Sequence, residues 1–203
     1  MRRRGKRRGS TAFTSVLAIR NRLVACTVVR HHALVTNWPY PVASGVPSPE
    51  MVAAWARLGL IPPEKVPLWA AHWLVAGYDG EHLVRLAGLH GDDPHDVHDA
   101  LPDALRDCGV AISESDAAAA IVMFMDLARM HLDGLAGPLW VCQKVDEVLN
   151  ASDYSEDVLG LPLGSLYCIA DEWDEGWGRP AEQLTALVRE VCEEQLRYGS
   201  VAT

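Results

Sequence analysis

The chain has 203 residues, of which 49% are apolar and 22% are charged. These values are typical of a globular protein with a hydrophobic core, and they exclude a collagen-like chain, a disulfide miniprotein and a chain disordered throughout. The formal net charge of −9 is unevenly distributed: residues 1–50 contain nine Lys/Arg and one acid, whereas residues 51–203 contain nine Lys/Arg and 26 Asp/Glu. We therefore expect a basic extension (1–50) followed by a single acidic domain (51–203).

The basic extension begins with the sequence MRRRGKRR and continues into an apolar stretch over residues 11–19. Arg20 and Arg22 interrupt this stretch, which disfavours a secretory signal. Several prolines between Pro39 and Pro49 are typical of a linker. Three interpretations remain open: a flexible, dispensable extension, a targeting segment, or a basic arm that binds nucleic acid. We expect the first of these.

The acidic part contains a succession of apolar stretches with helical spacing, many of them opened by Pro or closed by Gly. Pro is tolerated in the first turn of a helix, and Gly commonly follows the last turn. We therefore expect helices over residues 50–58, 62–76, 81–89, 94–109, 116–133, 139–149 and 162–173, and a last helix started by Pro180. Strand patterns are nearly absent, so the sequence predicts an all-α orthogonal bundle of about six to eight helices.

Three details follow from the same pattern. Pro102 is expected to kink or split the helix over 94–109, because it lacks a backbone N–H. Ser113 or Ser115 is expected to cap the helix over 116–133, whose nearly continuous apolar stretch predicts the buried middle of the fold. Trp69 and Trp73 are expected to lie in the core.

The five cysteines are too widely spaced to predict a disulfide framework or a zinc knuckle, so we expect reduced thiols and a cytoplasmic location. No segment has the roughly 18 uncharged apolar residues of a membrane span. The sequence contains no nucleophile elbow, phosphate loop or dinucleotide-binding motif. We therefore predict no catalytic residue and no cofactor.

Histidines and acids are most concentrated between residues 92 and 99. His95 and His98 are spaced so that both can lie on one face of a helix and share a metal ion, with Asp92 and Asp99 as further ligands. Alternatively, Asp93 caps the helix and both histidines point into solvent. The first interpretation underlies an alternative function, that of a small metal-dependent hydrolase.

A second polar segment combines four acids with two tryptophans: Asp171, Glu172, Trp173, Asp174, Glu175 and Trp177. We expect these acids in the last turn of a helix, where the helix dipole makes negative charge unfavourable. One interpretation is that they are solvated and have Arg179 as a neighbour. The other is a binding patch for a cationic partner, because aromatic side chains among charges are typical of protein interfaces.

The stretches Trp69–Gly109 and Leu161–Leu196, the second containing LPLGSLYCIADEWDEGWGR, resemble small acidic helical proteins of high-GC bacteria. Some of those proteins look like immunity proteins of bacterial toxin systems. The resemblance implies binding to another protein and carries over no functional residue. We therefore expect a non-enzymatic interaction module that masks a basic protein surface, and we expect the acidic body to repel nucleic acid.

Overall fold

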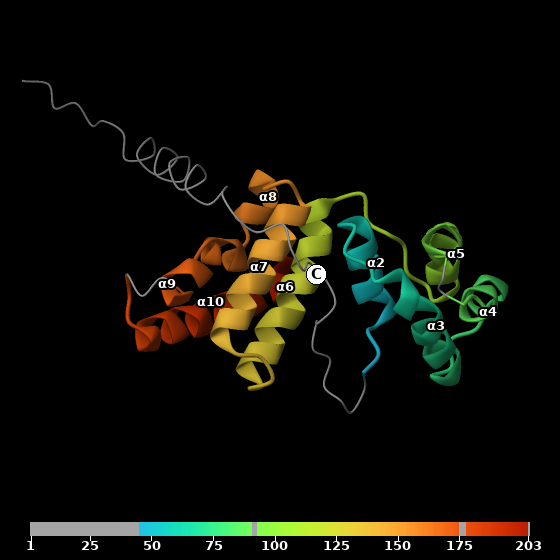
Figure 1. Ribbon diagram of the computed structural model, residues 1–203, viewed down its shortest axis with the longest axis horizontal. Helices are drawn as coiled ribbons and strands as arrows, with labels where there is room; N and C mark the ends of the chain where they lie inside the picture. The colour runs from blue at the N-terminus through green and yellow to red at the C-terminus, as the bar shows by residue number, and fades with distance from the viewer. Residues whose placement is uncertain (1–44, 91–92, 175–177, 203) are drawn as a thin grey trace, which may run out of the picture. The chain divides into compact units, whose positions relative to one another are not determined.

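The computed structural model describes residues 45–90, 93–174 and 178–202, all of which belong to one compact unit of the chain. Every regular element in these residues is a helix (Figure 1). The prediction of an all-α fold is therefore confirmed. Seven of the nine described α-helices have at least seven residues, in agreement with the predicted six to eight. The predicted flexible extension lies almost entirely outside the described residues.

In chain order the elements are α2 (Pro49–Arg57), the 3₁₀-helix η1 (Pro63–Lys65), α3 (Val66–Val75), α4 (Glu81–Ala87), α5 (Pro94–Asp107), α6 (Asp116–Leu132), α7 (Pro138–Ala151), α8 (Glu156–Leu159), the 3₁₀-helix η2 (Pro162–Leu166), α9 (Ala170–Asp174) and α10 (Ala181–Ala202).

Side-chain caps explain where three of these helices begin. The hydroxyl of Ser48 accepts a hydrogen bond from the backbone N–H of Met51, and the carboxylate of Asp93 accepts one from the N–H of His95. Ser115, rather than Ser113, is the N-cap residue of α6. Each cap satisfies a backbone donor that has no partner within the helix.

Helix α6 occupies the middle of the fold, as predicted. It packs against α2, α7 and α10 (Figure 1). Met123, Phe124 and Leu127 on α6 are fully buried. An apolar stretch this long is stable only when neighbouring elements cover it on more than one side.

The tryptophans of α2 and α3 lie in the core, which confirms the prediction for Trp69 and Trp73. The rings of Trp55 and Trp69 are 5.6 Å apart. The indole N–H of Trp73 donates a buried hydrogen bond of 2.8 Å to the backbone oxygen of Pro47. Residues that precede α2 are therefore part of the packed structure.

The structure corrects two local predictions, the possible split at Pro102 and the single helix over residues 162–173. Pro102 does not split α5, which continues from Pro94 to Asp107. Pro102 is exposed, so the carbonyl that loses its helical partner can bond to water. The helix predicted over residues 162–173 is instead divided into η2 and α9, because Cys168 has a φ of 58° and cannot continue a right-handed helix.

Candidate functional site

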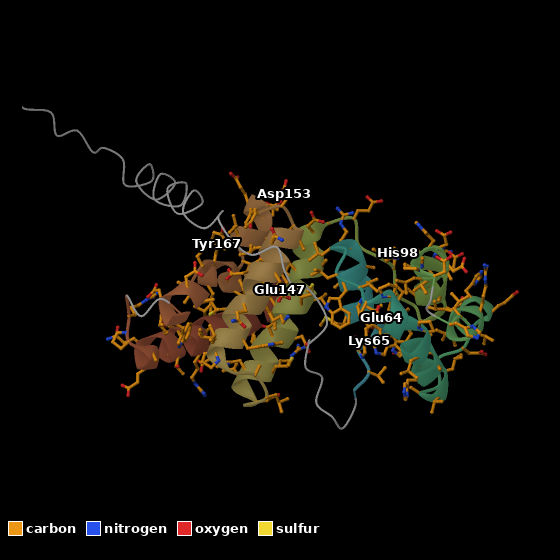
Figure 2. All side chains as sticks on the ribbon, viewed as in Figure 1. Glu64, Lys65, His98, Glu147, Asp153 and Tyr167 are labelled. Atoms are coloured by element: carbon orange, nitrogen blue, oxygen red, sulfur yellow. The ribbon has the colours of Figure 1, made fainter. Side chains whose placement is uncertain are left out.

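The segment from α7 to the start of the α9–α10 connection, residues 138–178, has an unusual composition. It contains nine acids and a single basic residue, Lys144, together with five aromatic residues. We call it the acidic segment. Figure 2 labels Glu147, Asp153 and Tyr167, which belong to this segment, on and around α7 and α8.

The one cation of the acidic segment is neutralised inside it. Lys144 is buried, and its ammonium group donates to both carboxylate oxygens of Glu147 at 2.8 and 2.7 Å. It also lies 5.6 Å from the ring centre of Trp140. Lys144 therefore offers no charge to offset the other acids at the surface of the segment.

Glu172 is also engaged within the chain. It is only 8% exposed, and its carboxylate accepts hydrogen bonds from the Nε and Nη2 atoms of Arg179 at 3.0 and 2.6 Å. The backbone N–H of Arg179 donates to the same carboxylate at 3.1 Å. Gly178, with a φ of 96°, passes so close that a Cβ atom there would be 2.7 Å from Glu172 Oε2. Glu172 on α9 is thus bound to Arg179, which lies just before α10.

The other predicted partner-binding residues differ in their surroundings. Asp171 is half-buried, and Trp173 is half-buried against the core. Asp174 ends α9, while Glu175 and Trp177 lie outside the described residues. Asp171 and Glu172 were expected at the end of a long helix started by Pro162. Because that helix is interrupted at Cys168, they lie instead in the separate α9, whose five residues make a little more than one turn, so the first turn and the last turn share both acids.

Two tyrosines and a strained turn lie in the same segment. The rings of Tyr154 and Tyr167 meet edge to face with their centres 5.6 Å apart. Asp153 and Tyr154 have φ values of 51° and 55°, a left-handed conformation that is uncommon for residues other than glycine. The acidic segment therefore presents tyrosine rings beside a turn with a constrained backbone.

Asp146 is the functional candidate that the sequence reasoning missed. Its Oδ1 atom accepts a 3.0 Å hydrogen bond from the backbone N–H of Cys168. Burial raises the pKa of Asp146 to about 7, and the nearby Asp171 and Glu147 add to the increase. No sequence pattern indicates this contact, because it joins residues 22 positions apart.

The proposed metal ligands do not converge in the described residues. His95, His98 and Asp99 are exposed on α5, and Asp92 lies outside the described residues. The Nδ1 atom of His98 is 3.1 Å from the backbone oxygen of Pro94, within the same helix. No group of three or more His, Cys, Asp or Glu side chains in the described chain is placed to hold a metal ion.

The buried thiols are poor nucleophiles at neutral pH. Burial raises the pKa of Cys142 and of Cys192 to about 12. The nucleophilic form of cysteine is the thiolate, which these two residues populate very little at such pKa values. Cys142 and Cys192 therefore act as apolar core residues.

Comparison of the chain with protein-family models, curated proteins and solved structures finds no match. None of the helices in the described residues combines the length and the apolar character needed to cross a membrane.

Proposed function

We propose that this chain is a non-enzymatic protein that binds a basic partner protein through the acidic segment. The observation that carries the proposal is the charge balance of residues 138–178, where nine acids accompany one lysine that is buried and bound to Glu147. Charge complementarity accelerates the encounter between proteins and disfavours partners of the wrong charge.

Aromatic residues supply the apolar contact that slows dissociation of the complex once it has formed. Tyr154, Tyr167 and Trp173 are partly buried and pack against the core, so each is held in place by the fold. Rigid aromatic side chains bury large areas at low entropic cost and are enriched among the residues that dominate binding energy. We expect the acids to control association and the aromatic residues to control dissociation.

The partner that best fits this surface is a protein with a Lys/Arg-rich face. Residues 51–203 carry 26 acids and nine bases, a balance that repels nucleic acid. An immunity-like role, in which the chain masks a basic surface of a toxin, is consistent with this chemistry and with the resemblance described above.

The test compares two triple variants with the same change in net charge. The surface variant replaces exposed acids of the acidic segment: Asp153→Asn, Glu156→Gln and Asp157→Asn. The control variant replaces exposed acids elsewhere: Glu64→Gln, Asp99→Asn and Glu114→Gln. Partners are captured from the source lysate with the full chain, and association rates are measured at several salt concentrations.

We expect the surface variant to associate more slowly than the control and to show a weaker dependence on salt. Trp177→Ala, which changes an aromatic residue of the predicted patch, should instead accelerate dissociation. The expected loss of binding free energy is about 2 kcal/mol. Equal association rates for the two triple variants would show that the acidic segment is not part of the interface.

A further inference from the structure

Helix α3 carries apolar side chains both on the side that packs in the core and on the side that faces away from it. Its sequence, VPLWAAHWLV, contains no Asp, Glu, Lys or Arg. Val66, Ala70 and Trp73 are buried, whereas Leu68 is 62% exposed and Val75 is 88% exposed. A helix that is apolar all round is normally covered on every side. We therefore expect a binding partner for the exposed side of α3.

Four residues form this outer face of α3: Leu68, Ala71, His72 and Val75. They are spaced i, i+3, i+4 and i+7, which places them in one stripe along the helix. Leu68 and Val75 stand at the two ends of the stripe, about 10 Å apart along the helix axis. Ala71 lies between them, and its small side chain lets a second helix come close. The outer face thus has the pattern with which one helix packs against another.

The negative charge of the chain is absent from this part of the sequence. Residues 51–90 contain three Lys/Arg and three Asp/Glu, so their net charge is zero. Residues 91–203 contain six Lys/Arg and 23 Asp/Glu, a net charge of −17. Two copies of the chain therefore repel each other least where α2, α3 and α4 meet. A basic partner, in contrast, finds no acid on the outer face of α3.

Exposed apolar side chains concentrate in the same uncharged part. Of the seven large apolar residues that are exposed in the described residues, four lie between residues 68 and 84. Besides Leu68 and Val75 they are Tyr78, which follows α3, and Val84 on α4, the helix that packs beside α3 (Figure 1). A helix of ten residues is only about 15 Å long, so its face alone is smaller than the roughly 800 Å² per partner of a standard interface. An association through this surface is therefore expected to be weak.

The outer face is complementary to itself when two α3 helices run antiparallel. A two-fold axis that passes between Ala71 and His72 is equally distant from Leu68 and Val75, which lie seven residues apart. Leu68 of one copy then lies opposite Val75 of the other, and the same contact repeats on the far side of the axis. A two-fold dimer requires such a surface, because the same patch is used by both copies.

We propose that the chain forms a weak two-fold dimer in which the outer faces of α3 from two copies pack antiparallel. The second copy is the partner favoured by the neutral charge of residues 51–90 and by the equal placement of Leu68 and Val75 about the axis. The dimer does not rest on the proposed function, because its residues lie outside the acidic segment.

The first experiment is sedimentation equilibrium of the full chain at concentrations from about 1 µM to about 1 mM, the range in which weak complexes form. We expect a dimer that dissociates on dilution. Val75→Asp places an unpaired carboxylate in the contact and should raise the dissociation constant roughly tenfold or more. Leu135→Asp is the matched control, since it makes the same charge change at an exposed apolar residue between α6 and α7. Thermal melts check that both variants fold.

The second experiment tests the antiparallel arrangement by mixing Leu68→Lys with Val75→Asp. Each variant alone should be mainly monomeric. In the mixed dimer the introduced lysine faces the introduced aspartate across the interface, while Val75 of one copy still faces Leu68 of the other, so the mixture should associate more strongly than either variant alone.

Three results would overturn the dimer. The wild-type chain could be a monomer at every concentration, which would mean that another molecule or another segment covers the outer face of α3. Val75→Asp could dimerise as well as Leu135→Asp. The mixture of Leu68→Lys and Val75→Asp could associate no better than the separate variants, which would exclude the antiparallel contact.

Discussion

Asp107, the last residue of α5, accepts a 2.9 Å hydrogen bond from the backbone N–H of Leu83 in the first turn of α4. The N–H of His82 donates to the same carboxylate oxygen at 2.8 Å. One helix thus caps the start of another across 24 residues of sequence. Gly80 makes this approach feasible, because a Cβ atom there would overlap the Asp107 side chain.

Replacing Asp107 with alanine should therefore lower the melting temperature by more than replacing the exposed Asp99 on the same helix. The hydrogen bond from Leu83 is the largest of the contacts that lower the pKa of Asp107. A lowered pKa means that the stabilisation is present above the ordinary pKa of aspartate and disappears as the pH falls through the folded value. Thermal melts at pH 7 and in acid should show the difference between the variants shrinking in acid, and an unchanged difference would contradict the capping role.

Trp73→Phe should destabilise the chain by about 1–3 kcal/mol, because it leaves the buried oxygen of Pro47 without its hydrogen bond. Trp69→Phe is the control, since Trp69 is also a buried tryptophan of α3 and the same volume is removed. Chemical denaturation of both variants measures the difference. If the two variants are equally stable, the contact between Pro47 and α3 contributes nothing.

Gly164→Ala should cost about 1–3 kcal/mol of stability, as overpacking of a core does. A Cβ atom at Gly164 would lie 2.6 Å from the backbone oxygen of Leu159 and 2.7 Å from that of Val158, and a backbone cannot yield as a flexible side chain can. At Gly137 nothing lies within 4 Å of such an atom, so Gly137→Ala should change the denaturation midpoint much less. Equal midpoints would show that η2 shifts freely over α8.

Asp146→Asn should make the stability of the chain less dependent on pH. The folded pKa of about 7 lies above that of an unfolded aspartate, so wild-type stability from this group falls as the pH rises from about 4 to 7. The asparagine variant avoids that loss and should gain of the order of 2–3 kcal/mol relative to wild type between pH 5 and pH 8, because most of the loss falls over the two units below the folded pKa and each unit is worth about 1.4 kcal/mol. Urea denaturation at the two pH values gives this difference, and a constant difference would contradict it.

The sequence was sufficient for features that depend on nearby residues. The caps at Asp93 and Ser115, the helix starts at prolines and the buried stretch of α6 all follow from local chemistry and periodicity. It was not sufficient for the break at Cys168, since cysteine has no preference for a positive φ and the supporting carboxyl comes from Asp146 on another helix.

The candidate site shows the same division. The acids and tryptophans of residues 171–177 are evident in the sequence, and Arg179 was foreseen as their neighbour. The burial of Glu172 and its bidentate ion pair with Arg179 depend on how α9 packs beside the start of α10. No local sequence pattern encodes this packing. The raised pKa of Asp146 likewise results from tertiary packing.

The measurement that tests the central claim most directly is hydrogen exchange of the full chain with and without its captured partner. The account predicts added protection in the acidic segment, from α7 through α9, with Tyr154, Tyr167 and Trp173 within the protected peptides. Protection confined to α2 through α5, with the acidic segment unchanged, would contradict it.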